Sequence, residues 1–330
     1  MIYKSPLDLV FGDIFLEIPE LLSHCKLFLK LEGLSLTGSI KIKSALRMLN
    51  RLEFEGVLRP GMSVIESSSG NLGLALAMVC AVKRYPFICV TDPNISPQTA
   101  KLIQAYGATL ITVRNRDDNG GFLGSRIALI KSMMQNDPRL VWTNQYENLH
   151  NVEAHYFSTG PEILRQFPLP DYVFVGSGTT GTLGGVSRYL RQHSPETRII
   201  AVDSVGSVTF GFPAGKRHIP GLGTSHPPAI RTYSDYDDIL MIDERLTVEM
   251  CHRQARRGLF LGGSSGTVLA GVAKMAHLIP SDACVVAISP DMGDRYIDTV
   301  YNLQWVEQHF PGLEHTLPGR AEAALEPAHA

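Results

Sequence analysis

A glycine- and hydroxyl-rich segment in the second half of the chain could bind a phosphate group. It follows an apolar run at residues 172–175 and reads Gly176-Ser177-Gly178-Thr179-Thr180-Gly181-Thr182. Where such a turn leads from a strand into a helix, unpaired backbone N–H groups and the helix dipole attract a phosphate. Its three glycines also have the spacing of a dinucleotide fingerprint, and Asp203 follows a second apolar run, somewhat beyond the usual distance. The segment alone therefore leaves two ligands open, a dinucleotide and a smaller phosphorylated cofactor.

Lys41 lies where a helix is expected to begin, at the end of the segment 36–41, Leu-Thr-Gly-Ser-Ile-Lys. A cation at a helix N-terminus meets an unfavourable dipole, which lowers its pKa and frees the amine for Schiff-base chemistry. The plainer alternative is a surface lysine, because most lysines are exposed. The position of Lys41 does not decide between the two.

Two further loops place polar residues directly before an apolar helix pattern. The loop 66–73 contains Ser68, Ser69 and Asn71. Its hydroxyls and glycines can form an anion nest for a substrate carboxylate, or a serine can simply cap the helix. The loop 261–267 contains Ser264. Ser264 is either a helix cap or a neutral hydroxyl that faces a heteroaromatic nitrogen and leaves it largely unprotonated.

These loops need a common framework to bring them together. Apolar runs of strand length occur at residues 27–31, 62–65, 86–91, 108–113, 172–175, 198–202 and 283–288. Helix-period stretches lie near residues 43–55, 72–84, 97–106, 122–135, 153–166, 182–193, 246–257 and 266–278. This alternation predicts an α/β fold with mostly parallel sheets, and ligands at the carboxyl ends of the strands. The irregular section 206–238 is long enough to be a functional loop.

The composition is that of a globular protein with about two domains. The 330 residues are 44% hydrophobic and 19% charged, and the formal net charge is -2. Such a charge predicts no nucleic-acid partner. No signal peptide is expected, and the longest uncharged apolar stretch, 72–82, is too short to cross a membrane. We therefore expect a cytoplasmic protein without a membrane partner.

The cysteines are far apart in the sequence and form no Cys-x-x-Cys pair. They are expected to be small buried hydrophobic residues in a reducing compartment, and no metal site is predicted. A catalytic thiol at one of them is the alternative. The cysteines are Cys25, Cys80, Cys89, Cys251 and Cys284.

Together, the four loops resemble the pyridoxal-phosphate enzymes of the cysteine synthase group. Their order is Ser-x-Lys at 39–41, Ser-Gly-Asn-x-Gly at 69–73, Gly-Thr-x-Gly-Thr at 178–182 and Gly-x-Ser-Ser-Gly at 262–266. The resemblance extends from about residue 8 to residue 308. It implies fold type II, similar to the tryptophan synthase β-subunit, and a homodimer. It also implies a large phosphate-binding domain, 1–35 and 146–330, and a small mobile domain, 36–145.

The resemblance implies a role for individual residues. Lys41 would bind pyridoxal 5'-phosphate covalently and later move the substrate's Cα proton, Asn71 would contact the ring hydroxyl, and Ser264 would face the pyridine nitrogen. The cofactor phosphate would be held by Gly178, Thr179, Thr180, Gly181 and Thr182. The substrate carboxylate would be held by Ser68, Ser69, the backbone N–H of Leu72, and Gln145.

Within this group the chain is most similar to a branch that acts in siderophore biosynthesis. The segments 92–97, 142–146, 206–208 and 290–296 carry this similarity. It implies a β-replacement in which O-phospho-L-serine and L-glutamate give N-(2-amino-2-carboxyethyl)-L-glutamate, a precursor of 2,3-diaminopropionate. Arg126, with Tyr146 as a hydroxyl partner, is the candidate for the phosphate leaving group, because a guanidinium offers a rigid fork of donors. The alternative for Arg126 is an ordinary helix-surface position.

Several positions depart from the usual cysteine synthase pattern. Leu72 replaces a threonine and so removes a hydroxyl beside the expected carboxylate site, and Lys43 stands where arginine is common. Thr-Pro and Asn-Pro pairs are replaced by Ile14-Phe15 and Ser35-Leu36. Three alternatives stay open: a cysteine synthase that uses sulfide with O-acetylserine or O-phosphoserine, an NAD-dependent dehydrogenase, and a non-enzymatic scaffold.

Overall fold

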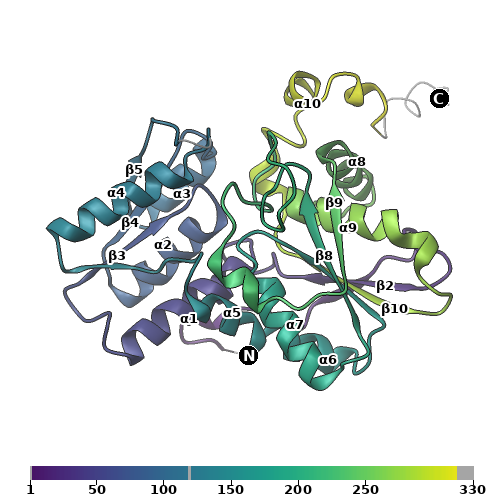
Figure 1. Cartoon of the computed structure of the whole chain (residues 1–330), viewed down its shortest axis with the longest axis horizontal. Helices are drawn as coiled ribbons and strands as arrows, with labels where there is room; N and C mark the ends of the chain where they lie inside the picture. Colours follow the sequence, from purple (N-terminus) through teal and green to yellow (C-terminus); the bar gives the residue numbers. More distant parts are fainter. Residues whose placement is uncertain (1, 118–119, 318–330) are drawn as a thin grey trace.

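Two sheets form the framework of the chain (Figure 1). The computed structural model describes residues 2–117 and 120–317. The larger sheet has the order β1 (Phe15–Glu17), β2 (Lys26–Leu31), β10 (Cys284–Ser289), β7 (Tyr172–Gly176), β8 (Arg198–Ser204) and β9 (Asp238–Ile242). The smaller sheet has the order β5 (Thr109–Thr112), β4 (Phe87–Thr91), β3 (Ser63–Ser67) and β6 (Leu140–Trp142). Within the described residues, β1 pairs antiparallel with β2 and the other pairings are parallel, which confirms the predicted α/β fold.

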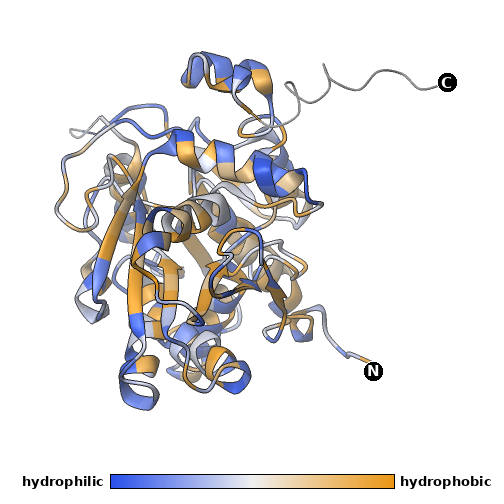
Figure 2. Cartoon of the chain, turned by 90° about the vertical axis from the view of Figure 1, so that its right-hand side faces the viewer, coloured by the Kyte–Doolittle hydropathy of each residue, from blue (hydrophilic) through white to orange (hydrophobic). Residues whose placement is uncertain are grey.

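Helices cover both faces of the larger sheet. They are α6 (Thr159–Gln166), α7 (Gly181–His193), α8 (Glu244–Ala255) and α9 (Gly263–Met275). Phe174 of β7 belongs to the same core as the apolar residues of α9, whereas its neighbours Val173 and Val175 share a core with α6 and α7. A strand that is buried on both faces is a continuous apolar run, which explains the pattern of β7. Figure 2 shows these hydrophobic strands enclosed by the helices.

The smaller sheet is covered in the same way. Its helices are α1 (Lys41–Phe54), α2 (Asn71–Lys83), α3 (Pro97–Ala105) and α4 (Leu123–Asn136). Val64 of β3 shares a core with α1 and α2, and its neighbour Ile65 packs with Ile130 of α4 on the opposite face. The stretch from Leu72 to Cys80 in α2 is buried throughout, so this apolar run is a core helix.

The structure differs from the sequence-based expectation at several elements. The stretch predicted as one helix near 153–166 is two helices, α5 (Leu149–Tyr156) and α6. Ser158, between them, is non-helical, and Pro161 lacks the N–H that a continuous helix would use, so it fits only the first turn of a new one. The short strands β1 and β6, β9 at the end of the irregular section, and α10 (Leu303–His309) were not predicted. The division into a large and a small domain stays a prediction.

Three neighbouring strands of the larger sheet deliver most of the candidate site. β2, β10 and β7 lie side by side and are parallel, so their carboxyl ends meet at one edge. They lead into the loops 32–40, 290–292 and 177–180, respectively. The bridge between Leu261 and Met292 brings the start of α9 to the same edge. Segments from both ends of the sequence are thereby placed together.

Candidate active site

The start of α7 has the geometry of an anion site. Thr180, its N-cap residue, is left-handed (φ 67°, ψ 4°) and makes no side-chain cap, so the first N–H groups of the helix lack that partner. Its hydroxyl oxygen is buried without a hydrogen-bond partner among the described residues. A Cβ at Gly181 would lie 2.4 Å from Asn151 Oδ1, and one at Gly178 would lie 2.9 Å from the Gly221 carbonyl. This glycine-lined turn fits a terminal phosphate.

Two residues of α5 hold the hydroxyls of this turn, and sequence reasoning missed both. The Asn151 amide donates to Thr179 Oγ1 at 3.1 Å and to the Gln145 carbonyl at 2.9 Å. His155 Nε2 lies 3.2 Å from Thr182 Oγ1. Burial and nearby lysine charges hold the pKa of His155 well below its usual value, so the imidazole is neutral. The signal in the sequence was their four-residue spacing, which puts two polar residues on one helix face.

Lys41 is the first residue of α1, as predicted. Burial of its amine lowers the pKa to about 8, against the opposing charge of Asp291. Burial, rather than the helix dipole invoked from the sequence, is therefore the main cause. The preceding residue is tied to the end of β10, since Ile40 N–H donates to the Pro290 carbonyl at 2.8 Å. Arg295 adds a second tie by donating to the carbonyls of Thr37 and Gly38 at 2.9 and 3.0 Å.

The lowered pKa predicts how fast the cofactor aldehyde attaches. Because only the neutral amine attacks a carbonyl, the attachment rate of Lys41 should rise about tenfold per pH unit below pH 8 and level off above it. Stopped-flow absorbance on cofactor-free protein mixed with pyridoxal phosphate measures this rate across pH. A rate that keeps rising to about pH 10.4, the value of an ordinary lysine, would contradict the prediction.

Asn71 and Ser264 are linked through one buried carboxylate. Asn71 Nδ2 donates to Asp291 Oδ2 at 2.9 Å, and the Tyr296 hydroxyl donates to the same oxygen at 2.5 Å. Tyr296 is also hydrogen-bonded to Ser264. A Cβ at Gly221 would lie only 2.1 Å from Ser264 Oγ, so the irregular section 206–238 passes directly over this serine.

The expected carboxylate loop precedes α2. The N-cap residue of α2 is Gly70, which makes no side-chain cap. Ser68 Oγ accepts the N–H groups of Gly70 and Gly73 at 3.3 and 2.9 Å, and its own proton stays available for donation. Glu66, which sequence reasoning missed, organises the partner segment: its carboxylate accepts the Gln145 N–H at 3.1 Å and the Thr143 hydroxyl at 2.5 Å. The Gln145 amide in turn donates to the Ser67 carbonyl at 3.1 Å.

The other two residues expected to bind the substrate carboxylate lie in the first turn of α2 and directly before it. Leu72 is buried near the start of the helix, and Ser69 is partly exposed just before it.

Arg126 is buried in α4, so the alternative of a surface arginine is wrong. Its guanidinium lies 3.3 Å from Asp92 Oδ2. Burial raises the pKa of Tyr146, which keeps the phenol protonated as a donor, and the charge of Arg126 acts on it. The structure therefore brings Arg126 and Tyr146 into one electrostatic environment. Arg217 of the irregular section acts on the same phenol and was not identified from the sequence.

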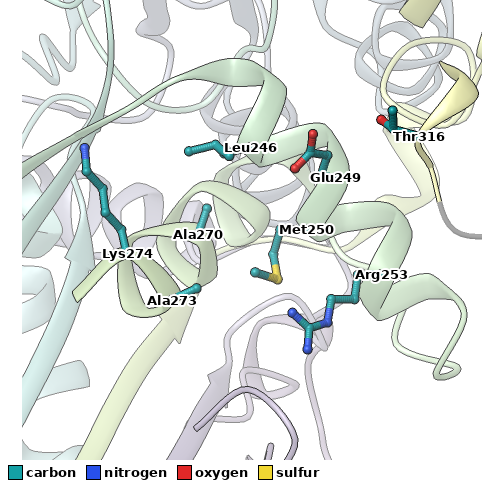
Figure 3. Close-up of a pocket in the computed structure, with 8 residues that line it drawn as sticks. All are labelled: Leu246, Glu249, Met250, Arg253, Ala270, Ala273, Lys274 and Thr316. Atoms are coloured by element: carbon teal, nitrogen blue, oxygen red, sulfur yellow. The ribbon is translucent and has the colours of Figure 1, made fainter. Parts of the chain in front are cut away.

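The dinucleotide interpretation depended on Asp203, and the alternative of a catalytic thiol depended on the cysteines. Asp203 is the penultimate residue of β8 and accepts the Ser204 N–H at 2.7 Å, and burial raises its pKa to about 6. The cysteines are unpaired, and burial raises the pKa of three thiols to about 12, so these are not thiolates at neutral pH. A pocket between α8 and α9 (Figure 3) is lined by none of the predicted site residues.

Residues 2–117 and 120–317 contain neither a candidate metal site nor a candidate membrane span. No group of three or more His, Cys, Asp or Glu side chains there is arranged to hold a metal ion. None of the helices in that part of the chain is both long and apolar enough to cross a membrane.

Comparison with known proteins agrees with a pyridoxal-phosphate site in this chain. The family model "Pyridoxal-phosphate dependent enzyme" matches residues 9–291. N-(2-amino-2-carboxyethyl)-L-glutamate synthase of Ralstonia nicotianae is 40% identical, over 99% of this chain and 97% of that protein. The protein of the same name from Cupriavidus metallidurans is 40% identical, over 86% of this chain and 85% of its own length.

A solved structure supports the fold assignment as well. The crystal structure of O-ureido-L-serine synthase has a TM-score of 0.85 and 29% identity, and the match covers 98% of this chain and 99% of that one. The resemblance predicted from the four loops is thereby confirmed, and the dehydrogenase and scaffold alternatives are not supported. The chain belongs to the family of pyridoxal-phosphate-dependent enzymes.

Proposed function

We propose that this enzyme joins O-phospho-L-serine and L-glutamate to give N-(2-amino-2-carboxyethyl)-L-glutamate, with release of phosphate. The observation that carries the proposal is the 40% identity, over nearly the whole chain, to a synthase named for that product. Arg126 supports a phosphorylated donor: it is buried, its charge acts on Tyr146, and its Nε has no partner among the described residues although the guanidinium lies 3.3 Å from Asp92. A desolvated guanidinium binds an anion more strongly than an exposed one does. The product would serve as a precursor of 2,3-diaminopropionate in siderophore biosynthesis.

The chemistry of the candidate site residues supports binding of the cofactor. Residues 178–182 would hold its phosphate at the start of α7, where backbone N–H groups and the Thr180 hydroxyl, which has no partner among the described residues, could bind an anion. Lys41 would hold it covalently, Asn71 would donate to its ring hydroxyl, and Ser264 would face its ring nitrogen. When bound, pyridoxal phosphate supplies an electron sink for the negative charge that develops at the substrate's Cα.

The chain's own groups would then bind the substrate and move the protons. Ser68, Ser69, the Leu72 N–H and Gln145 would hold the carboxylate of phosphoserine in place. Lys41 Nζ would take the Cα proton, after which the Cβ–O bond breaks and phosphate leaves toward Arg126 and Tyr146. The glutamate nitrogen would bond to Cβ and lose a proton, and Lys41 would return a proton to Cα. Closure of residues 36–145 over the substrate would exclude water during these steps.

Arg126 provides a prediction about the donor. In Arg126→Gln the KM for phosphoserine should rise about 10- to 100-fold, because a charge-assisted hydrogen bond to phosphate is lost. The KM for O-acetylserine, which carries no phosphate, should change little, and Arg126→Lys should lie between the two. Steady-state kinetics with both donors measures the difference. Equal effects on the two donors would show that Arg126 only supports the fold.

The proposal is tested by mass spectrometry of the products. Holoenzyme incubated with phosphoserine and glutamate should form the condensed product and release one phosphate per turnover. The competing cysteine synthase function is tested in the same vessel by adding sulfide. Formation of cysteine in preference to the glutamate adduct would overturn the proposal, and so would the absence of any condensed product.

We also propose that the enzyme is a cytoplasmic homodimer whose substrates are small amino acids, as the family resemblance implies. Light scattering coupled to gel filtration tests the dimer. Fractionation of the source cells tests the location.

A further inference from the structure

Asp291 lies at the centre of the candidate site, and the proposed function assigns it no role. It follows β10 by two residues and is fully buried. Ser39 pairs with it in an isolated bridge, and its carbonyl accepts the N–H of Gly262 at 3.1 Å. Asp291 is therefore held between the loop that ends at Lys41 and the start of α9, which carries Ser264.

The Asp291 carboxylate determines how the Asn71 amide is turned. A carboxylate only accepts hydrogen bonds, so the Asn71 group that faces Oδ2 at 2.9 Å is the N–H donor and not the carbonyl. The second hydrogen on that nitrogen remains available for another acceptor. Burial raises the pKa of Asp291, and the hydrogen bonds from Tyr296, at 2.5 Å to the same oxygen, and from Asn71 act against that rise.

The other carboxylate oxygen, Oδ1, is buried without a hydrogen-bond partner in the part of the chain that the structure describes. It lies close to the start of α9, since a Cβ at Gly262 would be 2.2 Å from it. The charge of Asp291 acts on the Lys41 amine and opposes the effect of burial there. A buried carboxyl group with one oxygen unpartnered among the described residues thus acts electrostatically on the nitrogen that must bind and release the cofactor.

Few other groups near Asp291 can change charge around neutral pH. The charged and titratable side chains that act on it or respond to it are Lys41, Arg295, Tyr296, Cys251 and Tyr301. Burial raises the pKa of Cys251 to about 12 and holds the pKa of both tyrosines well above its usual value, so these three stay neutral. Of these groups, Lys41, whose pKa burial lowers to about 8, changes charge in this range, and the charge of Asp291 acts on it.

We propose that Asp291 is a positioning residue of the cofactor site: by accepting one N–H of Asn71, its carboxylate directs the other toward the cofactor's ring hydroxyl, and its charge favours a protonated nitrogen on Lys41. The proposal rests on the placement of the cofactor between Lys41 and Asn71 described above. Asp291 does not touch the reacting atoms in this arrangement. It acts through Asn71 by a hydrogen bond and on Lys41 through space.

The charge is tested by titrating the absorbance of bound cofactor against pH, without substrate. In Asp291→Asn the midpoint should move down by about one pH unit, because a nearby anion no longer stabilises the protonated nitrogen. Asp294→Asn is the matched control: it removes an exposed carboxylate three residues away and should leave the midpoint unchanged. A midpoint in Asp291→Asn equal to that of the wild type would overturn the charge effect.

The hydrogen bond is tested by measuring cofactor affinity in a double-mutant cycle with Asn71→Ala. Where Asn71 is present, Asp291→Asn should weaken cofactor binding about tenfold, because the Asn71 amide can then turn. In the Asn71→Ala background, Asp291→Asn should weaken cofactor binding little further. Equal weakening in both backgrounds would overturn the role through Asn71. If Asp291→Asn fails to fold, Asp291→Glu can be used because it keeps the charge. This variant should retain the midpoint of the absorbance titration and lose affinity for the cofactor. A midpoint that falls by about one unit in Asp291→Glu would count against the proposal.

These measurements use pyridoxal phosphate alone, so they are independent of the amino-acid substrates. Failure of the phosphoserine and glutamate assay would overturn the proposed reaction and leave the titration result valid. Failure of the titration and the affinity cycle would overturn only the role of Asp291.

Discussion

Lys41→Ala should lose covalent attachment of pyridoxal phosphate and lower turnover by about 1,000-fold or more. The substitution removes both the amine that binds the cofactor and the base that moves the Cα proton, and a positioned base alone contributes about 100- to 10,000-fold. The measurements are the absorbance of the purified protein, intact mass after borohydride reduction, and turnover with phosphoserine and glutamate. In the wild type, reduction should fix the cofactor to a peptide that contains Lys41.

The matched control for this prediction is Lys101→Ala. Lys101 lies exposed on α3, and its removal should leave attachment and turnover unchanged. If Lys41→Ala retained a reducible link to the cofactor, another lysine would be the attachment site. In that case the role taken from the family resemblance would be wrong.

Glu32→Gln should lower the free energy of unfolding by about 3–5 kcal/mol, because it strands a positive charge in the interior. Four charged side chains form a neutral buried cluster: Lys30, Glu32, Lys43 and Glu162. Glu32 lies 3.0 Å from Lys30 and 2.8 Å from Lys43, while Glu162 lies 2.8 and 2.6 Å from the same two amines. Urea denaturation of the cofactor-free protein measures the change. Glu17→Gln, an exposed change on β1, is the control and should cost little.

The same cluster gives the stability of the wild type a pH dependence. Burial alone would raise the pKa of Glu162, but the charges of Lys43 and Lys30 hold it below its usual value. The cluster's contribution from Glu162 is thus present above the ordinary glutamate pKa and is lost as the pH falls through the lowered one. Burial alone would lower the pKa of Lys43, but the charges of Glu32 and Glu162 raise it above its usual value. The contribution of Lys43 to stability is therefore lost only when the pH rises through that raised pKa. Stability that stays constant in acid through the lowered pKa of Glu162 would show that the cluster is not ionised.

Local patterns in the sequence were sufficient for the framework and for the loops that approach the cofactor. Strands such as β7 are continuous apolar runs because both faces are buried, and the helix that begins at Lys41 could be placed because a loop of glycine and hydroxyl residues precedes it. The short strand β6 was missed because three residues carry too little pattern. The split between α5 and α6 was missed because the apolar period continues across Ser158.

The supporting residues of the site could not be derived from local pattern, because their partners are distant in the sequence. Asp291 pairs with Asn71 across 220 positions, and Lys43 with Glu162 across 119. Spacing says nothing about such pairs until the sheet order is known. Lys43 was noted only as a departure from an arginine, whereas the structure shows it inside the buried charge cluster. The sequence left two interpretations of Arg126 open, a ligand of the phosphate leaving group and a helix-surface residue. Its burial excludes the second.

The strand order also constrains when during synthesis the enzyme becomes able to bind its cofactor. β10 ends at Ser289, near the end of the described chain, yet it is inserted between β2 and β7, which the ribosome completes much earlier. Until β10 emerges, β2 and β7 have no partner between them, and the loops with Lys41 and Gly178 have no common edge. A nascent chain that stops before β10 therefore contains Lys41 and the phosphate-binding turn but has no cofactor site. Only a chain whose larger sheet is complete is expected to bind the cofactor.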